Sequence, residues 1–221
     1  MQLSEEFVTL MKNFSAINPS IVLRKGNTQR IMAANKTILA EAEFADDIPN
    51  DFGIYDLNEF LNVVSLFSDT NLDFSEKYVL VSDGGTSKIK YFAAGEGVVK
   101  SAPTTIKFPS SDVSFTLEAG QLAMIQRTSS VLKASDVAIV GADGKLKVIV
   151  SDKKNDTSNA YEVTLGDTDE TFKANIKVEN LKMLPGDYEV SVSSKKISRF
   201  KSPSSDLVYY VAVEADSTFE F

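Results

Sequence analysis

The chain has 221 residues, of which 31 are acidic and 23 basic, so its formal net charge is −8. It has no cysteine and no histidine, which excludes disulfides, thiolate metal sites and catalysis by either residue type. No apolar run approaches the ~18 residues of a membrane span, and the acidic start MQLSEEFVTL is unlike a signal peptide. We therefore expect a protein that uses no cofactor, holds no metal and does not enter a membrane.

The first half of the chain alternates predicted helices and strands. A helix capped by Ser4 is predicted from an apolar stripe at helical spacing, formed by Leu3, Phe7, Leu10, Met11 and Phe14. Strand-like stretches IVLRK and QRIMAA follow, and AEFADD (42–47) is predicted to be a solvated acidic loop. A second helix is predicted from Leu57, Phe60, Leu61 and Val64. YVLVS and KIKYFAA then flank DGGT as strands.

A stretch without helical period, AGEGVVKSAPTTIKFPSS (94–111), separates the two halves and is predicted to be a linker. Beyond it, a third helix is predicted from Leu122, Ile125, Ser129 and Leu132. Asp143-Gly144 between two alternating apolar runs predicts a hairpin. A fourth helix is predicted over VENLKMLPG (178–186), and LVYYVAVE is the last predicted strand.

The order of these elements repeats. A helix followed by strands recurs four times, beginning near residues 3, 55, 119 and 178. We predict an N-terminal domain (1–97), a linker (98–111) and a C-terminal domain (112–221). Each domain would be a tandem pair of strand-helix-strands units. The predicted fold class is α+β with mostly antiparallel sheets, whose helices cover one face.

Basic residues lie opposite the apolar stripes of three predicted helices. The stretch AGQLAMIQRTSSVLKAS (119–135) contains no acid in an acidic chain and carries Arg127 and Lys133. Lys12 on the first helix and Lys177 and Lys182 on the fourth also lie outside the stripes, whereas the second helix has no outward base. A single outward lysine usually marks a solvated face, and Lys133 could instead complement the helix dipole.

Other candidate sites are weak. DTDET (167–171) could hold a divalent ion, but its aspartates are also typical of a hairpin turn. No GxxxxGK[ST] loop occurs, so nucleotide binding has no support. An enzyme would need carboxylate-only or metal-assisted catalysis, and we expect none.

Several stretches resemble the sliding clamps of T-even-type bacteriophages, the DNA polymerase processivity factors. They are YDLNEFLNVVSLF (55–67), YEVTLGD (161–167), NLKMLPGDYEV (180–190) and, most specifically, YVAVEADST (210–218). The resemblance runs through the whole chain. It implies a homotrimeric ring of two-domain protomers in which helices line a central hole, sheets form the rim and double-stranded DNA threads the centre.

The resemblance also implies partners and sites. The ring would bind DNA without reading its sequence and would be opened by a clamp loader in the cytoplasm of the infected bacterium. Lys12, Arg127 and Lys182 fall where the family carries basic residues that face the hole, and Lys133 and Lys177 are further candidates. Acid elsewhere would keep the outer surface off nucleic acid, which makes the net charge of −8 compatible with DNA binding.

Clamps of this type dock the C-terminal peptide of a DNA polymerase near the linker and the last strand. The apolar residues predicted to line such a pocket are Val98, Val99, Ile106, Phe108, Tyr210 and Ala212. The linker residues could instead only pin the linker to the domains. Alternation along the last strand sends Tyr210 and Ala212 to one face and Val211 and Val213 to the other, without showing which face is buried. The alternative function is a β-rich phage structural protein that self-assembles and binds no DNA.

Overall fold

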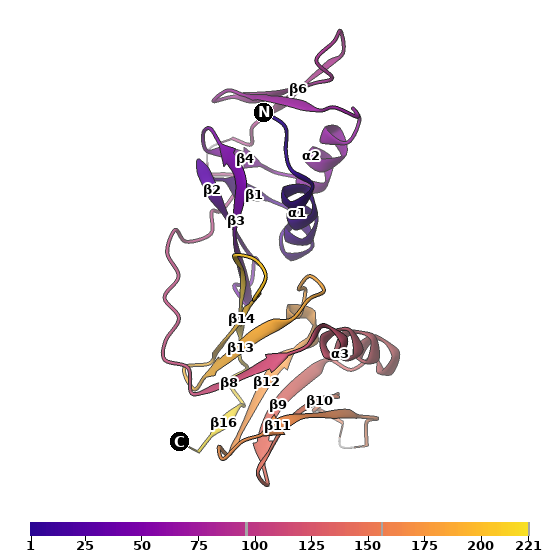
Figure 1. Cartoon of the computed structure of the whole chain (residues 1–221), viewed down its shortest axis with the longest axis vertical. Coiled ribbons are helices and arrows are strands. Elements are labelled where there is room, and N and C mark those ends of the chain that lie inside the picture. The colour runs from indigo at the N-terminus through magenta and orange to yellow at the C-terminus, as the bar shows by residue number, and fades with distance from the viewer. Residues whose placement is uncertain (96, 156, 221) are drawn as a thin grey trace. The chain divides into compact units, whose positions relative to one another are not determined.

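The computed structural model describes residues 1–95, 97–155 and 157–220. The chain divides into two compact units, Met1–Thr105 and Ile106–Phe221, so the boundary falls within segment 98–111. Figure 1 shows the first unit in indigo to magenta and the second in pink to yellow.

Two helices of the first unit pack against each other and carry the predicted stripes. Helix α1 (Glu5–Ile17) begins at Ser4, whose Oγ accepts a hydrogen bond from the Phe7 amide at 3.1 Å. Helix α2 (Leu57–Val64) begins at Asp56, whose Oδ1 accepts from the Glu59 amide. These caps satisfy amides that have no partner inside the helix. The two helices are in contact, and their buried residues are Phe7, Leu10, Met11, Phe14, Ile17, Leu57, Phe60, Leu61 and Val64.

The strands of the first unit pair in antiparallel fashion. Strand β1 (Ile21–Leu23) pairs with β4 (Phe52–Ile54), and β2 (Gly26–Met32) pairs with β3 (Ile38–Ile48). A further sheet has the order β5 (Asn71–Phe74), β6 (Tyr78–Ser82), β7 (Lys88–Phe92). Met1 covers the outer edge of β5, since its amino group donates to Leu72 O and its carbonyl accepts from Leu72 N. Strand β7 is the last in this sheet.

The prediction of an acidic loop at 42–47 is wrong. These residues lie inside β3, where burial alternates residue by residue and Ala42, Phe44 and Asp46 are buried. The Phe44 ring packs on Phe7 of α1 at 4.8 Å between centroids. The Asp46 carboxylate accepts from the Ser4 amide at 2.8 Å and from Ser4 Oγ at 2.5 Å. Asp46 is therefore the group that holds the start of α1 against the sheet.

The second unit contains two groups of antiparallel strands. In the first, β8 (Val113–Leu117), β13 (Tyr188–Ser193), β14 (Ile197–Lys201) and β15 (Leu207–Ala212) are neighbours in that order. In the second, the order is β11 (Tyr161–Asp167), β10 (Lys145–Ser151), β9 (Asp136–Ala142), β12 (Phe172–Lys177) and β16 (Thr218–Phe219). Strand β11 is the last on its side. The predicted Asp143-Gly144 hairpin between β9 and β10 is confirmed, with φ of 53° and 74° at the two turn residues.

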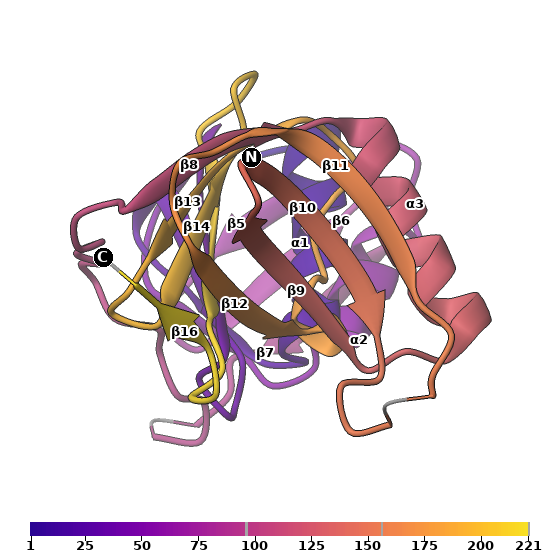
Figure 2. The ribbon, with the colours of Figure 1, turned by 90° about the horizontal axis from the view of Figure 1, so that it is seen from below.

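Helix α3 (Ala119–Leu132) covers one face of the second sheet, beside β10 and β11, as Figure 2 shows. Three residues of the predicted stripe are buried, Leu122, Ile125 and Ser129, whereas the fourth, Leu132, is half-buried at the end of the helix. The Ser129 hydroxyl is satisfied by donating to Gln126 O at 2.7 Å. Asp187 Oδ1 accepts from the Ala119 amide at 2.7 Å and so fixes the start of the helix.

The fourth predicted helix is wrong beyond a single 3₁₀ turn, η1 (Val178–Asn180). Side chains take the backbone hydrogen bonds that a helix would have used: Gln126 Nε2 donates to Leu181 O, and Tyr188 Oη donates to Leu184 O. Residues 181–184 then run on with alternating burial, Leu181 and Met183 inward and Lys182 outward. The α+β class with mostly antiparallel sheets is confirmed, and three of the four predicted helix-and-strands units begin with an α-helix.

Candidate DNA-facing surface and partner site

The predicted DNA-facing residues on α1 and α3 lie where the helical pattern placed them. Lys12 and Arg127 are exposed and lie on the helix faces opposite the buried stripes. The exposed face of α3 holds Ala123, Met124, Arg127, Ser130 and Val131, so it contains no acid. A phosphate chain beside this face would meet a cation and no repulsive charge.

The other positions that were predicted to be helical differ in whether they present an exposed cation. Lys133 is the C-cap of α3 and adopts a left-handed backbone with φ of 53°, its amide donating to the last turn while its side chain is exposed. Lys182 is also exposed, on the extended segment after η1. On α2 the exposed residues are Asn58, Glu59 and Asn62, so this helix supplies no cation.

Lys177 is bound into an ion-pair cluster. Its Nζ lies 2.5 Å from Oδ1 of Asp136, a carboxylate only 3 % exposed, and Lys153 Nζ lies 3.8 Å from the same oxygen. Lys153 also approaches Asp216 Oδ2 at 2.8 Å, which ties the segment after β15 to this cluster. A lysine paired with a buried carboxylate attracts a polyanion less than a free one does.

Electrostatics in the cluster follow from this geometry. Burial raises the pKa of Asp136, but hydrogen bonds from Lys177 and Ser135 outweigh it and lower that pKa below its ordinary value. The same hydrogen bond to Asp136 raises the pKa of Lys177 above its ordinary value. Both charged forms are therefore stabilised by the fold.

We expect Asp136→Asn to lower the free energy of unfolding by about 3 kcal/mol at neutral pH, because it leaves Lys177 without its buried partner. The Asp136 contribution is complete above its ordinary pKa of 3.8 and is lost as the pH falls through the lower folded value. The Lys177 contribution is complete below its ordinary pKa of 10.5 and is lost as the pH rises through the higher folded value. Urea unfolding across the pH range measures this.

The matched control is Asp167→Asn, which removes an exposed ion pair with Lys145 and should cost no more than about 0.5 kcal/mol. Equal losses of stability in the two variants would contradict the role of Asp136 as the buried partner of Lys177. The same holds if the stability of the Asp136→Asn protein falls with acid as steeply as that of the wild type.

The predicted partner-site residues divide between the two units. In the first unit Val98 is 59 % exposed, whereas Val99 is buried in a hollow that Val22 and Phe52 also line. In the second unit Ile106, Phe108, Tyr210 and Ala212 are half-buried. The buried face of β15 carries Tyr209 and Val211, so Tyr210 and Ala212 belong to the outer face.

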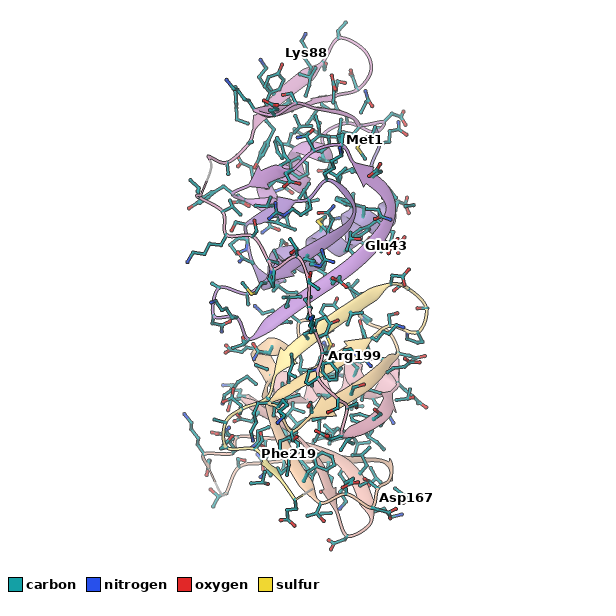
Figure 3. All side chains as sticks on the ribbon, turned by 90° about the vertical axis from the view of Figure 1, so that its left-hand side faces the viewer. Met1, Glu43, Lys88, Asp167, Arg199 and Phe219 are labelled. Atoms are coloured by element: carbon teal, nitrogen blue, oxygen red, sulfur yellow. The ribbon has the colours of Figure 1, made fainter. Side chains whose placement is uncertain are left out.

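Phe108 packs on this outer face. Its ring centroid lies 6.4 Å from that of Tyr210, and the guanidinium carbon of Arg199 lies 4.9 Å from the Phe108 ring centroid. Arg199 stands opposite Tyr210 in the β14–β15 register, which places both side chains on the same face. Figure 3 labels Arg199, which lies on β14. The structure thus brings together Phe108 before β8 and Tyr210 of β15, and adds Arg199, which we did not predict.

A metal site has no support from the side chains. No group of three or more acidic residues that could hold an ion occurs in residues 1–95, 97–155 and 157–220. Asp167 belongs to the end of β11, where Lys145 Nζ lies 2.6 Å from its Oδ1. Within the same described ranges, no helix has the length and apolarity that a membrane crossing requires.

Comparison with known proteins places both units of the chain in one protein family. Residues 4–98 match the family model described as DNA polymerase processivity factor, and residues 114–215 match that of the gp45 sliding clamp C-terminal domain. The chain belongs to the sliding-clamp family. It is 32 % identical to the sliding clamp of Vibrio phage KVP40 over 97 % of this chain and all of that protein. It is 35 % identical to the sliding clamp of Enterobacteria phage T4 over the full length of both.

Solved structures show the same fold at lower identity. The proliferating cellular nuclear antigen of Entamoeba histolytica gives a TM-score of 0.68 at 16 % identity and covers 94 % of both chains. A PCNA2–PCNA3 complex from Sulfolobus tokodaii gives 0.66 at 12 % identity, covering 95 % of this chain and 96 % of that one. The predicted resemblance to the sliding clamps of T-even-type phages is confirmed.

Proposed function

We propose that this sliding clamp encircles double-stranded DNA as a homotrimeric ring and tethers the replicative DNA polymerase, without catalysing a reaction. It would act in the cytoplasm of the infected bacterium, where a clamp loader opens the ring. One observation carries the proposal: the chain matches sliding clamps over its full length, in both of its units.

Contact with DNA would go through phosphates. Lys12, Arg127 and Lys182 are exposed cations that can approach a phosphate chain without reading bases. Lys133 offers a further cation at the end of α3, and Lys177 contributes less because Asp136 neutralises it. Attraction of this kind is weak and falls with salt. Retention on DNA would therefore depend on closure of the ring.

The activity is tested by primer extension on a long, singly primed circular template with the cognate polymerase and clamp loader. Addition of this protein should lengthen the products of a single binding event, and linearising the template should reduce the effect because an encircling ring slides off a free end. Equal stimulation on circular and linear templates would argue against encirclement.

Ring closure needs two strand edges, and each unit offers a candidate among its described strands. Strand β7 is the last in its sheet and has half-buried Ile89 on one face, and β11 is the last in its sheet and has half-buried Leu165. Figure 3 labels Lys88 at the start of β7 and Asp167 at the end of β11. Unpaired edges are templates for pairing with another chain, so we propose that β7 of one protomer pairs with β11 of the next.

Ile89→Asp or Leu165→Asp should convert the trimer, about 72 kDa for three chains of 24.1 kDa, into monomers. A charge at either edge would be buried against an apolar neighbour in the closed ring and would remain solvated in the monomer. Sedimentation analysis gives the mass, and circular dichroism checks the fold.

The control for the edge variants is Leu66→Asp, which changes a leucine that is 65 % exposed in the loop after α2. It should leave the trimer intact. A trimer that survives both edge substitutions would show that other strands form the interface.

The polymerase peptide would dock at the outer face of β14 and β15, where Phe108, Tyr210 and Ala212 are half-buried. Such a peptide needs an apolar surface that stays accessible in the free protein. Ile106 and the exposed Val98 extend the set of apolar residues on the connecting segment, while Val99 serves mainly the core of the first unit.

A further inference from the structure

Few neighbouring groups balance the positive charge of Arg199 or accept its hydrogen bonds. Its Nη2 donates to Ser191 Oγ at 3.1 Å, and its Nε is buried with no hydrogen-bond partner. Within residues 1–95, 97–155 and 157–220, no carboxylate lies within ion-pair distance of its guanidinium. A half-buried guanidinium has lost part of its hydration. Because its Nε is buried, an acceptor from outside would reach the terminal nitrogens.

The surroundings of Arg199 are apolar. The guanidinium carbon of Arg199 lies 4.9 Å from the centroid of the Phe108 ring, and Tyr210 stands opposite Arg199 in the strand register. Ile197 and Ala212 form the next pair on the same face of β14 and β15. A cation–π contact with an aromatic ring does not use up the N–H groups of a guanidinium, so those that are not buried stay available for hydrogen bonds. The terminal nitrogens of a guanidinium can bind a carboxylate in a fork geometry.

We propose that Arg199 recognises a carboxylate of the docked polymerase peptide, next to an apolar side chain that rests on Phe108 and Tyr210. This inference rests on the proposed function, which places the peptide at this face. A half-buried cation beside Phe108, Tyr210 and Ala212 suits a short segment that is both acidic and apolar. It does not suit a DNA backbone, which would need several cations in a row.

The experiment uses the C-terminal peptide of the cognate polymerase in two synthetic forms. One form has its natural carboxylates, and the other has Asn for Asp, Gln for Glu and an amidated C-terminus. Affinities for the assembled wild-type protein, Arg199→Gln and Arg199→Lys are measured by calorimetry. Wild type should prefer the carboxylate form by about tenfold or more, and Arg199→Gln should lose most of that preference.

Arg199→Lys should retain part of the preference, since it keeps the charge and loses the fork. The matched control is Lys201→Gln, which removes an exposed charge two residues along the same strand and should keep the preference. Circular dichroism and sedimentation confirm that each variant is folded and assembled.

Two failures can be told apart. If both peptide forms bind and the preference is the same in wild type and Arg199→Gln, the role of Arg199 is overturned while docking stands. If neither form binds wild type and the polymerase is not stimulated, the proposed function fails and this inference fails with it.

Discussion

Changing Lys12, Arg127 and Lys182 together to Glu is expected to reduce polymerase stimulation on long templates to the level seen without the clamp. In the proposed ring, each reversal would replace an attraction to phosphate by a repulsion in every protomer. All three side chains are exposed, so the fold and the trimer should persist. Product length in the primer-extension assay measures the effect, and raising the salt should weaken wild type in the same direction.

The control for this triple variant changes the same charge elsewhere. Lys25, Lys77 and Lys154 are exposed in loops, and their joint change to Glu should leave product length nearly unaltered. Stimulation that survives the first set of reversals, or that is lost equally with the second, would show that the named residues do not face DNA.

Ile106→Asp combined with Phe108→Asp is expected to abolish binding of the polymerase peptide while leaving the ring assembled. The Phe108 ring packs on Tyr210 and Arg199, so the change removes an apolar anchor surface and places a carboxylate beside the guanidinium. Loss of an anchor typically costs ~2 kcal/mol or more, which is about 30-fold in affinity. Calorimetry with the natural peptide decides the outcome.

Tyr55→Asp supplies the control, because this tyrosine is 68 % exposed in the first unit and contributes to no predicted site. It should bind the peptide as wild type does. Unchanged affinity in an assembled Ile106→Asp, Phe108→Asp protein would place the pocket elsewhere.

Local patterns predicted much of the fold. The stripes of α1, α2 and α3 and the Asp143-Gly144 turn required only residue spacing and turn chemistry, so they were predicted correctly except at their ends: Leu3 precedes α1, and Leu132 is half-buried. Strand β3 was missed because the acids of AEFADD suggested solvent, although Ala42 and Phe44 alternate with them. The signal was present in the period of two.

Tertiary contacts decided the remaining elements. Residues 178–184 have apolar positions that suit a helix, yet the side chain of Gln126, which is distant in sequence, takes the backbone carbonyl of Leu181, and the nearby Tyr188 hydroxyl takes that of Leu184. No local pattern could show the competition from Gln126.

The site was predicted in part. The exposure of Lys12 and Arg127 opposite the buried stripes could be predicted from helical geometry. The ion pair of Lys177 with Asp136 depends on the register of β12 on β9. The contact of Phe108 with Arg199 depends on how the segment before β8 packs against β14. The sequence alone supplies neither, because the segments are far apart in the chain. Burial of Val211 rather than Tyr210 likewise depends on which face of the sheet is covered, and the alternation of residues along β15 does not show this.

The central claim is that the protein forms a closed ring around DNA. Negative-stain imaging of the purified protein, with its mass measured by light scattering at the same concentration, tests this most directly. We predict three-fold particles with a central hole and a mass of about 72 kDa, three times that of one chain. Monomers at high concentration, or open filaments without a hole, would contradict the account and favour a structural protein that binds no DNA.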